Sequence, residues 1–470
     1  PDQTRIPMPP KFGTSGLRGL VVDLTDTLCA DYAQAFLQGV ETDGTVLIGR
    51  DLRDSSPRIA AAVATGAARA GLNAIDCGVL PTPALALAAT TRGTAAIMVT
   101  GSHIPADRNG LKFYTRHGEI TKDDETSIAN GVAALATPAE GSAAMKKDTT
   151  ALAAFTDRYT AYFAPDALTG LRIGVYEHSS AAQSCLAPIL TALGAFAVPL
   201  GRSETFIPVD TEALDPDTQG MLAGWAEEHS LDAVVSTDGD ADRPMLADAA
   251  GRVIPGDRLG PLTAKALGAN TLVTPVSSNT LADLIPGMTV HRTKIGSPYV
   301  IAGMEAAMAG GAGNVVGYEA NGGFLIGFTA TRDGRSLAPL MTRDCILPIL
   351  APLSLACSQG LSIADLNATL PARFTAADRL VGVETDKSRT LIEALFADTA
   401  TQTRLFAPYG PVTHVDDTDG FRATFADTLI IHLRPSGNAP ECRVYVEAGA
   451  QTRADTVLAD MLGRVQTALD

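Results

Sequence analysis

The stretch LDAVVSTDGDADR, residues 231–243, decides the fold of this chain of 470 residues. Its first six residues form the mostly apolar run of a buried strand, which ends at Thr237 before an acidic cluster. In that cluster Asp238, Asp240 and Asp242 fall at every second position. The carboxylates therefore occupy a loop at the C-terminal end of a strand, which is where open α/β sheets bind their ligands.

Three carboxylates this close together repel one another unless a cation lies among them. Hard oxygen ligands favour Mg²⁺ or Ca²⁺ over zinc. The Ca²⁺-binding loop that begins D-x-D-x-D needs Gly at its sixth position and Glu at its twelfth, but this chain has Arg243 and Ala249 there. The sequence therefore predicts a hard-cation site of another kind. A solvated acidic turn is the alternative, because Asp and Gly are common turn residues.

The composition is that of a globular enzyme with several domains. The usual domain size of about 150 residues predicts three or four domains in a chain of this length. The formal net charge of −16 argues against binding to nucleic acid or to an anionic membrane surface. Any anionic substrate must then be met by local arginines and lysines, because the overall field repels it.

Cysteine usage and the N-terminal sequence predict a soluble, cytoplasmic protein without a signal peptide. The cysteines form no C-x-x-C pair and no cluster, which is typical of small buried residues in a reducing compartment. They are Cys29, Cys77, Cys185, Cys345, Cys357 and Cys442. Residues 1–11 are polar and Pro-rich and lack the apolar core of a signal peptide. The most apolar long stretch, residues 345–357, contains two prolines and is too short to cross a bilayer.

An apolar strand that leads into a polar, Gly-containing loop occurs three times along the chain. Residues 95–99 lead into Thr100–His103, residues 231–236 into the acidic loop, and residues 314–318 into Glu319–Gly323. Short apolar runs alternate with helical patterns, which is typical of the α/β class. We therefore predict three related α/β domains with mixed, mostly parallel sheets around a central cleft.

The C-terminal part of the chain has a different pattern. Segments 412–414, 421–425 and 428–434 are typical of β-strands separated by Asp-Gly and Asp-Thr turns. Residues 452–469 then follow the pattern of an amphipathic helix. This predicts a smaller C-terminal α+β domain with an antiparallel sheet.

Domain boundaries are predicted from segments rich in Pro, Gly and small polar residues. Residues 136–150 resemble a linker, Asp248–Asp257 holds a Gly-Arg turn and a Pro-Gly pair that suit a hinge, and Leu370-Pro371 ends the third unit. The predicted domains are residues 1–150, 151–254, 255–371 and 372–470.

The segment TGSHIPADRNGLKFY, residues 100–114, offers a hydroxyl at a strand end. Ser102 lies beside His103, and Lys112 follows an Asn109-Gly110 turn that would fold it back toward them. A serine needs a base or a strongly electrophilic partner to act as a nucleophile. No G-x-S-x-G elbow surrounds Ser102, which argues against an α/β-hydrolase. A turn or capping serine is the alternative.

The segment RPSGNAPECR, residues 434–443, combines two arginines, a serine hydroxyl, an amide and a glycine. The planar guanidinium group matches phosphate oxygens in shape, and a glycine lets backbone N–H groups approach an anion closely. The segment therefore predicts the local cationic site that the net charge requires. A polar hairpin loop is the alternative.

Three further segments carry weaker signals. The turn YEANGG, residues 318–323, offers an acid and an amide that suit sugar hydroxyls, but such residues are also common in simple turns. The Gly-rich loop FGTSGLRG, residues 12–19, contains Arg18 and suits a phosphate, although it lacks the G-x-x-x-x-G-K-[ST] pattern of nucleotide loops. Lys294 precedes a predicted helix start, a place that favours anions.

Taken together and in this order, the motifs resemble those of the α-D-phosphohexomutases, and within them the phosphomannomutase/phosphoglucomutase branch. T-G-S-H-x-P resembles the phosphoserine loop of that family, D-G-D-A-D-R its metal loop, G-Y-E-A-N-G its sugar loop and R-P-S-G-N-A-P-E its phosphate-binding loop. The resemblance covers essentially the whole chain. It implies a Mg²⁺-dependent phosphotransferase that interconverts hexose 6-phosphates and hexose 1-phosphates through a phosphoserine and a hexose 1,6-bisphosphate.

The resemblance also implies roles for individual residues. It implies that Ser102 is phosphorylated and that Ser102, Asp238, Asp240 and Asp242 hold Mg²⁺. The groups that surround the transferring phosphoryl group are Arg18, His103, Lys112 and Arg243, and our hypothesis for the proton-transfer group is Lys112 or His103. The substrate-binding residues are Lys294, Ser297, Glu319 and Asn321, together with a clamp on the phosphate that does not react, formed by Arg434, Ser436, Gly437, Asn438 and Arg443.

Some positions depart from the common family pattern. Residues 320–322 are Ala-Asn-Gly where many members carry a Ser-Gly pair, and Ser297 stands where many have a His or an acid. Residues 438–439 are Asn-Ala in the clamp. The resemblance implies phosphomannomutase activity on small hexose phosphates by a monomer or homodimer. Phosphoglucomutase activity, dual specificity and phosphoglucosamine mutase activity are alternatives, and a non-catalytic sugar-phosphate-binding protein is the alternative of another class.

Overall fold

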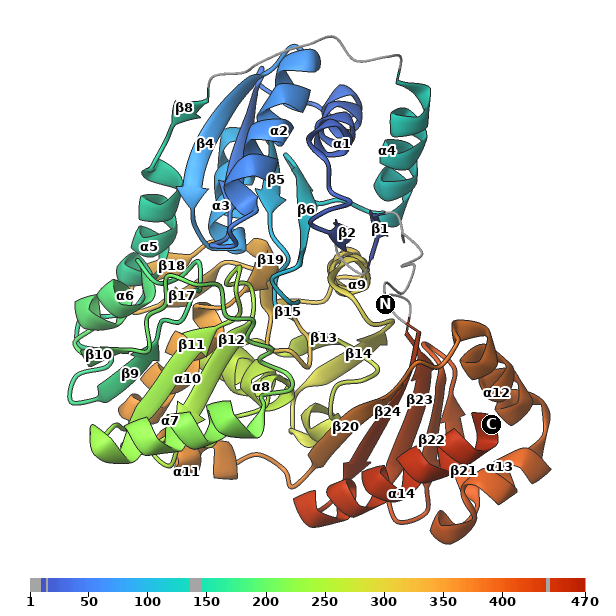
Figure 1. The fold of residues 1–470 in the computed structure, drawn as a ribbon. Coiled ribbons are helices and arrows are strands. Elements are labelled where there is room, and N and C mark those ends of the chain that lie inside the picture. The colour runs from blue at the N-terminus through green and yellow to red at the C-terminus, as the bar shows by residue number, and fades with distance from the viewer. Residues whose placement is uncertain (1–9, 14–15, 136–144, 437–439, 470) are drawn as a thin grey trace.

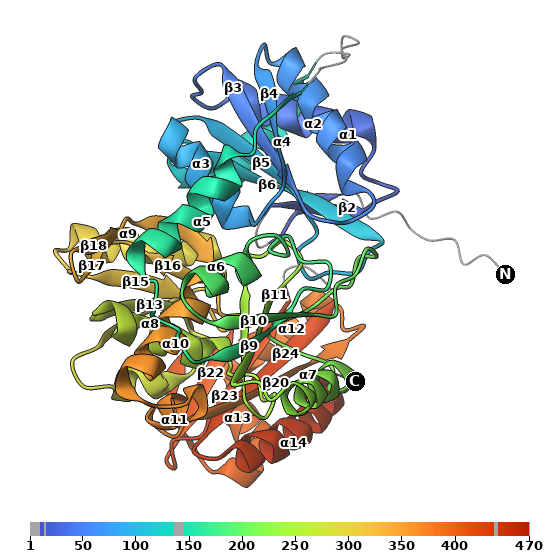
Figure 2. The same cartoon turned by 90° about the vertical axis from the view of Figure 1, so that its left-hand side faces the viewer.

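The computed structural model describes residues 10–13, 16–135, 145–436 and 440–469, and its sheets divide them into four consecutive units. Figure 1 shows unit one at the top, units two and three below it, and unit four at the lower right. Figure 2 shows the same arrangement from the side, with unit one again above the others.

The elements of each unit follow one another along the chain. Unit one holds β1 (Lys11–Phe12), β2 (Leu17–Leu20), α1 (Asp26–Gln38), β3 (Thr45–Arg50), α2 (Ser56–Arg69), β4 (Asn73–Val79), α3 (Thr82–Arg92), β5 (Ala95–Val99), β6 (Arg108–Thr115), β7 (Gly118–Glu119), α4 (Lys122–Ala134) and β8 (Lys146–Lys147). Unit two holds α5 (Thr150–Tyr162), β9 (Arg172–Tyr176), α6 (Leu186–Ala192), β10 (Phe196–Leu200), α7 (Pro216–Glu228), β11 (Ala233–Thr237) and β12 (Pro244–Asp248).

Unit three holds α8 (Gly256–Leu267), β13 (Thr271–Pro275), η1 (Thr280–Leu284), β14 (Thr289–Thr293), α9 (Ser297–Ala309), β15 (Val315–Tyr318), β16 (Phe324–Ile326), β17 (Ala330–Arg332), β18 (Arg335–Leu337), β19 (Leu340–Asp344), α10 (Leu347–Gln359) and α11 (Ile363–Ala368). Unit four holds β20 (Phe374–Val381), α12 (Thr385–Ala397), α13 (Thr399–Leu405), η2 (Ala407–Tyr409), β21 (Val412–Asp416), β22 (Phe421–Phe425), β23 (Ile430–Pro435), β24 (Glu441–Ala448) and α14 (Gln451–Leu469). Across the ranges that the structure describes, every helix is too short or too polar to span a bilayer.

Units one, two and three repeat one strand order. The order is β4-β3-β5-β6 in unit one, β10-β9-β11-β12 in unit two and β14-β13-β15-β16 in unit three. In each unit the first three strands of this order are parallel and the last strand pairs antiparallel with its neighbour. The predicted fold class, three related α/β units with mixed sheets followed by an α+β unit, is confirmed.

The predicted functional loops occupy the same place in each repeat. Residues 100–107 join β5 to β6, residues 238–243 join β11 to β12, and residues 319–323 join β15 to β16. The strands that lead into these loops are buried along their whole length, as expected for strands that are covered on both faces. Each loop therefore begins at the carboxyl end of a rigid central strand.

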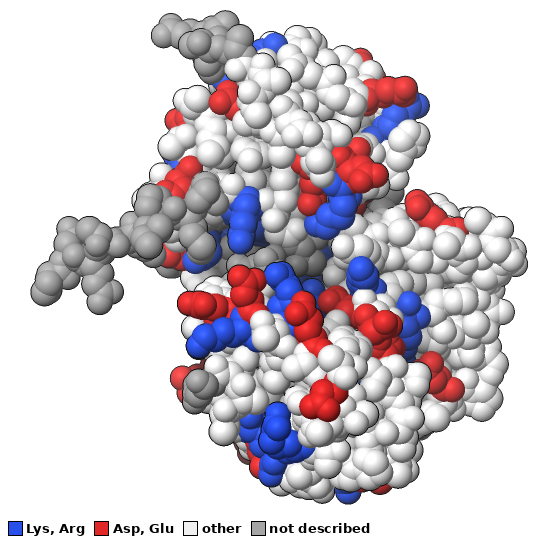
Figure 3. All heavy atoms as spheres, turned by 90° about the vertical axis from the view of Figure 1, so that its right-hand side faces the viewer, with Lys and Arg blue, Asp and Glu red and all other residues white. Residues whose placement is uncertain are grey.

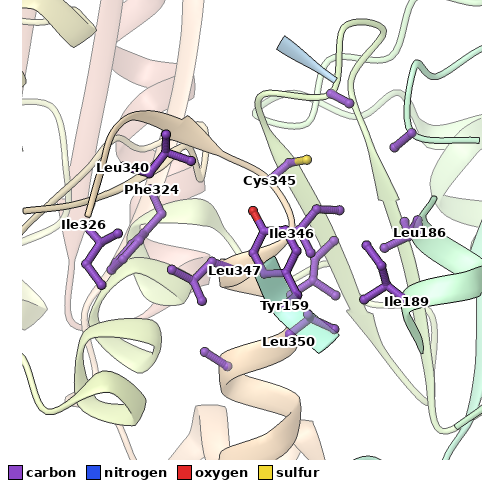
Figure 4. Packing of buried hydrophobic residues seen from close by; sticks show 14 of the residues in the cluster. Tyr159, Leu186, Ile189, Phe324, Ile326, Leu340, Cys345, Ile346, Leu347 and Leu350 are labelled. Atoms are coloured by element: carbon purple, nitrogen blue, oxygen red, sulfur yellow. The ribbon is translucent and has the colours of Figure 1, made fainter. Parts of the chain in front are cut away.

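One continuous cluster of buried side chains joins the first three units. Figure 4 shows Leu186 and Ile189 of α6 beside Tyr159 of α5 and the start of α10, where Ile346 and Leu350 lie. Helices from two units thus share one apolar layer, and its burial stabilises their relative position. Unit four has its own core, a separate cluster between its sheet and α12, α13 and α14.

Unit four is an antiparallel sheet of order β20-β24-β23-β22-β21, and polar groups form much of its junction with unit three. Arg373 Nε donates to Glu447 Oε1 at 2.6 Å, and the backbone N–H of Thr280 donates to the same oxygen at 3.1 Å. Asn279 Nδ2 donates to Thr375 Oγ1 at 3.0 Å. A junction of this kind is more easily rearranged than the apolar core that joins units one to three.

Two local predictions differ from the structure. Asn109 and Gly110 form no turn, because both lie inside β6, and Lys112 is carried by that strand opposite Met98 of β5. The predicted linker, residues 136–150, contains β8, which pairs in parallel with β4. Residues 136–144 of that segment lie outside the described residues. The exact domain limits remain predictions.

Asp257, at the start of α8, makes the junction between units three and four sensitive to pH. Burial and the neighbouring Glu447 raise the pKa of Asp257 to about 6, although the backbone N–H of Asn279 donates to its carboxylate. In the unfolded chain the pKa is near 3.8. The folded protein therefore holds this proton more tightly, and stability falls as the pH rises from the lower to the higher value.

We predict that Asp257→Asn removes this loss of stability. The gap between the two pKa values corresponds to about 3 kcal/mol at neutral pH. The melting temperature of the variant relative to the parent should rise between about pH 4.5 and about pH 7.5 in thermal denaturation. Asp333→Asn, in the exposed turn between β17 and β18, is the control and should show no such trend. An equal difference at both pH values would contradict the prediction.

Candidate active site

The loop of unit one that is predicted to carry the phosphoserine, residues 100–107, contacts the acidic loop of unit two directly. Ser102 Oγ donates to Asp238 Oδ2 at 2.6 Å. Two further contacts join α3 to the acidic loop, because Thr82 donates from its backbone N–H to the carbonyl of Asp240 at 2.9 Å and from its hydroxyl to Asp240 Oδ2 at 2.6 Å. The structure thus brings together the predicted serine and the predicted carboxylates from two units.

Both loops hold a residue in a strained backbone conformation. Ser102 and Ala241 each have φ of 54°, in the left-handed region that non-glycine residues rarely adopt. Between them, Gly239 packs so closely that an added Cβ would lie 2.8 Å from the carbonyl oxygen of Ser102. Such strain is maintained only where the surrounding structure over-determines it, and it concentrates at functional sites.

Each carboxylate of the acidic loop uses part of its hydrogen-bonding capacity within the protein. Asp238 Oδ1 accepts from the backbone N–H groups of Asp242 and Arg243. Lys112 Nζ lies 2.6 Å from both Asp240 Oδ2 and Asp242 Oδ2. All three carboxylates are buried, and one oxygen of each lies within 4.8 Å of the others.

Two oxygens of this cluster remain without a hydrogen bond. Asp240 Oδ1 and Asp242 Oδ1 are buried and have no donor among the described residues. A buried carboxylate oxygen without a partner is costly unless a cation compensates it. An all-oxygen site with two such atoms suits a hard divalent cation, and the residues present therefore fit Mg²⁺.

The pKa shifts within the cluster also indicate a cation site. Burial and the two neighbouring carboxylates raise the pKa of Asp238 well above its usual range. Burial also acts on Asp240, but the Lys112 ammonium and the Thr82 hydroxyl outweigh it and lower the pKa of that carboxyl. A divalent cation would remove the repulsion at Asp238, because its charge favours the ionised form of every carboxylate around it.

The other predicted groups around the serine also lie at the site. His103 Nδ1 is 3.4 Å from Ser102 Oγ, and burial with the nearby Arg243 and Arg18 lowers the pKa of His103 to about 2. Arg18 Nη1 donates to the carbonyl of Thr100 at 2.9 Å. Arg243 Nε is buried without a hydrogen bond to any described residue, and it lies 3.9 Å from Asp242 Oδ1.

A single arginine supports the serine loop from behind. Arg53 is 1% exposed, and its Nε donates to Asp51 Oδ2 at 3.1 Å. Its two Nη atoms donate to the backbone carbonyls of Ser102, Ile104 and Pro105 in the loop and of Arg108 at the start of β6. The ring of Phe206, from unit two, lies 3.9 Å from the guanidinium carbon. The conformation of the loop therefore depends on one fully engaged guanidinium group.

The loop of unit three that is predicted to contact the sugar, residues 319–323, is connected to the acidic loop through Arg343. This arginine lies 2.7 Å from Asp242 Oδ2 and 3.5 Å from Glu319 Oε2. Burial raises the pKa of Glu319, and Arg343 and Arg243 oppose that rise. Asn321 is buried, and its Oδ1 accepts from the backbone N–H of Gly323 at 3.0 Å. Both predicted sugar contacts therefore lie on a loop that is tied to the acidic cluster.

Lys294, which precedes α9, and Ser297, its first residue, lie in different surroundings. Lys294 is exposed. Ser297 is fully buried, and its hydroxyl donates to Glu119 Oε2 of unit one at 2.7 Å. In this structure Ser297 thus joins unit three to unit one, and a direct contact with substrate remains a prediction.

The predicted phosphate clamp lies on unit four. Arg434 Nε donates to Asp419 Oδ1 at 2.9 Å, and the other oxygen of Asp419 accepts from the backbone N–H of Ile295 of unit three. Ser436 is buried, and Arg443 Nη2 lies 3.6 Å from Glu441 Oε2. The predicted residues Gly437 and Asn438 lie outside the described residues.

Figure 3 shows the face of the molecule that lies on the right-hand side of Figure 1. A hollow separates the upper and lower parts of this face, and Lys, Arg, Asp and Glu side chains lie along its rim.

Comparison with known families accounts for nearly all of the chain. Profiles described as phosphoglucomutase/phosphomannomutase alpha/beta/alpha domains I, II and III match residues 9–138, 153–251 and 255–374, and the C-terminal domain of the same family matches residues 381–463. A protein named phosphomannomutase from Sinorhizobium fredii is 45% identical over 98% of this chain and 100% of its own length. The chain belongs to the phosphoglucomutase/phosphomannomutase family. The predicted family and enzyme class are thereby confirmed.

Other members of the phosphoglucomutase/phosphomannomutase family show the same relationship. A phosphomannomutase from Salmonella muenchen is 42% identical over 97% of this chain and 96% of its own length. A phosphoglucosamine mutase from Thermobifida fusca is 31% identical over 97% of each chain. A crystal structure of a phosphomannomutase from Thermus thermophilus covers 98% of this chain with a TM-score of 0.76 at 21% identity, which supports the fold.

Sequence reasoning missed four residues at this family member's site: Arg53, Thr82, Arg343 and Asp419. Arg53 and Arg343 each lie close to an aspartate in the sequence, in Asp51-Leu52-Arg53 and in Arg343-Asp344. Such a pair is a weak signal of a buried arginine with its counter-ion. The local sequence gives no signal for Thr82 or Asp419, because their partners lie in other units. Thr82 contacts Asp240 of unit two, and Asp419 contacts the backbone of Ile295 of unit three.

We predict that Arg53→Lys loosens the serine loop. A lysine has three donors where the guanidinium engages five acceptors, so at least two of these acceptors lose a partner, at a cost of about 2–5 kcal/mol. Hydrogen exchange followed by mass spectrometry should show faster exchange over residues 101–108, with a lower melting temperature. Arg58→Lys, on the exposed face of α2, is the control and should leave the loop unchanged. Equal exchange in both variants would contradict this role of Arg53.

Proposed function

We propose that this protein is a phosphomannomutase that interconverts mannose 6-phosphate and mannose 1-phosphate through a phosphorylated Ser102 and a hexose 1,6-bisphosphate. The observation that carries the proposal is the contact of Ser102 with a buried carboxylate cluster in which two oxygens have no hydrogen bond to any residue that the structure describes. Near-full-length identity of 45% and 42% to relatives named phosphomannomutase supports the choice of sugar. The free cysteines support a reducing, cytoplasmic compartment.

Charge neutralisation is the main requirement of the proposed reaction. Phosphoryl transfer depends on positioning and on stabilising charge over the oxygens of the moving group. Asp238, Asp240, Asp242 and the phosphate on Ser102 would hold Mg²⁺, which when bound supplies a positive charge at those oxygens. Arg18, Lys112 and Arg243 add positive charge from the protein.

The proposed transfer breaks the bond between phosphorus and Ser102 Oγ and forms a bond from phosphorus to a sugar hydroxyl oxygen. The hydroxyl proton must leave as the new bond forms, and Ser102 Oγ must gain a proton as its bond to phosphorus breaks. The neutral imidazole of His103 is the proposed acceptor of the first proton, and the Lys112 ammonium is the proposed donor of the second. In the second half of the reaction the bisphosphate returns its other phosphoryl group to Ser102 Oγ, the Ser102 proton returns to Lys112, and His103 returns a proton to the sugar oxygen. Phosphate and proton balance over the cycle, so only a priming amount of bisphosphate is needed.

The remaining predicted residues are proposed to bind the sugar and the phosphate that does not react. Glu319 and Asn321, with Lys294 and Ser297 nearby in unit three, are the proposed sugar-side residues. Arg434, Ser436, Gly437, Asn438 and Arg443 are the proposed clamp on the phosphate that does not react. A clamp on unit four, outside the shared core of the other units, suits a substrate that must bind in two orientations.

Sequence identity favours a neutral sugar over an amino sugar as substrate. Relatives named phosphomannomutase are 45% and 42% identical to this chain, whereas relatives named phosphoglucosamine mutase from Thermobifida fusca and Kineococcus radiotolerans are 31% and 32% identical. Glucose phosphates differ from mannose phosphates in one hydroxyl configuration, so phosphoglucomutase activity remains a second candidate.

The proposed function is tested by a mutase assay on the 1-phosphates of mannose, glucose and glucosamine, with Mg²⁺ and a priming amount of the matching 1,6-bisphosphate. We expect turnover of the mannose substrate, slower turnover of glucose 1-phosphate, and the lowest kcat/KM for glucosamine 1-phosphate. Removal of Mg²⁺ with EDTA should abolish activity, and added Mg²⁺ should restore it. Absence of turnover on all three sugars would favour the non-catalytic binding protein.

We predict that Asp240→Asn separates phosphoryl transfer from substrate binding. The variant loses one negative charge beside the proposed cation but keeps the shape of the side chain and lies apart from the clamp on unit four. The rate should fall by about a thousandfold or more, as expected for loss of a charged group at the reacting centre. Binding of mannose 6-phosphate, measured by calorimetry, should change by less than about threefold. Parallel loss of binding and rate would contradict this separation of roles.

A further inference from the structure

Arg343 is a buried cation that connects the acidic loop with the sugar loop. It is the fourth residue of β19, and 4% of it is exposed. Its Nη2 lies 2.7 Å from Asp242 Oδ2, and its Nη1 lies 3.5 Å from Glu319 Oε2. One planar guanidinium group therefore contacts carboxylates from two units at once.

The residues on either side of Arg343 are fixed to other units. Thr342 Oγ1 donates to Glu119 Oε1 of unit one at 2.7 Å. The hydroxyl of Tyr159, from unit two, donates to Asp344 Oδ2 at 2.7 Å. The strand that carries Arg343 is thus held from both sides, and the guanidinium group has little freedom to follow either carboxylate.

We propose that Arg343 is a positioning residue that sets the separation and orientation of Asp242 and Glu319. The inference rests on the proposed phosphoryl transfer, in which one carboxylate serves the phosphate end and the other serves the sugar. The fork of a guanidinium group binds two acceptors in a fixed geometry, whereas a lysine ammonium supplies only the charge. Arg343 therefore keeps the sugar contact at a set distance from Ser102.

Arg343 also determines which oxygen of Asp242 is available to a cation. Asp242 Oδ2 contacts both Lys112 and Arg343, which leaves Oδ1 as the buried oxygen without a hydrogen bond to any described residue. The positive charge of the guanidinium opposes a cation at this site, because like charges a few ångströms apart repel strongly in a buried environment. Arg343 thus orients the carboxylate while weakening its attraction for a metal ion.

The test compares Arg343→Met, Arg343→Lys and Arg258→Met with the parent protein. Arg258 is similarly buried in unit three but contacts Asn367 and the carbonyl of Arg373, away from the site. We expect kcat/KM for mannose 1-phosphate to fall by about a hundredfold in Arg343→Met, as for a misplaced reacting group. Arg343→Lys should recover only part of this loss. Arg258→Met should lower the melting temperature but keep kcat/KM within about twofold.

Mg²⁺ binding to the unphosphorylated protein, measured by calorimetry, gives a readout that does not depend on turnover. We expect Arg343→Met to bind Mg²⁺ several times more tightly than the parent, because a repelling charge is removed, and Arg343→Lys to resemble the parent. Weaker Mg²⁺ binding in Arg343→Met, together with a lower melting temperature, would indicate a merely structural role and overturn the proposal. Unchanged kcat/KM in Arg343→Met would overturn it as well.

Failure of the proposed function can be told apart from failure of this inference. If the parent turns over no hexose phosphate, calorimetry with mannose 6-phosphate still compares Arg343→Met, Glu319→Gln and the double variant. Coupling predicts that the double variant loses little more affinity than Glu319→Gln alone. Additive losses would show that Arg343 acts independently of Glu319 and would overturn the proposal.

Discussion

The structure depends on the burial of three carboxylates within one loop of the second unit. Groups from two other units contact them: Ser102 and Thr82 of unit one donate hydrogen bonds, and Lys112 of unit one and Arg343 of unit three add positive charge. These contacts persist only while the three units stay together, and the apolar core that the units share holds them in place.

Unit four is not part of the apolar core that joins units one to three. It has its own core, and it meets unit three through side-chain hydrogen bonds around Glu447 and through Asp419, which links Arg434 to the backbone of Ile295. Polar contacts of this kind exchange readily with water, whereas separating the apolar core of units one to three would expose a large hydrophobic area. The division places the proposed reacting groups on the units that share an apolar core and the proposed clamp on the unit that is joined to them largely by polar contacts.

Much of the fold could be predicted from sequence because each repeat ends a buried apolar run with a polar loop. The strands before Ser102, Asp238 and Glu319 were found in this way, and so were β21, β22, β23 and the last helix of unit four, but β20 and β24 were not predicted. The turn expected at Asn109-Gly110 was wrong, because both residues pair with β2 and the same strand continues through residues 111–114, which pair with β5. Arg53 and Arg343 escaped prediction because their importance comes from partners distant in sequence, which local pattern does not reveal.

The acidic net charge is compatible with an anionic substrate because the cations of the site are already held by carboxylates. Lys112 contacts Asp240 and Asp242, Arg343 contacts Asp242 and Glu319, and Arg434 contacts Asp419. An arginine or lysine held in this way is oriented before a ligand arrives, so a phosphate meets fixed donors and loses less entropy on binding.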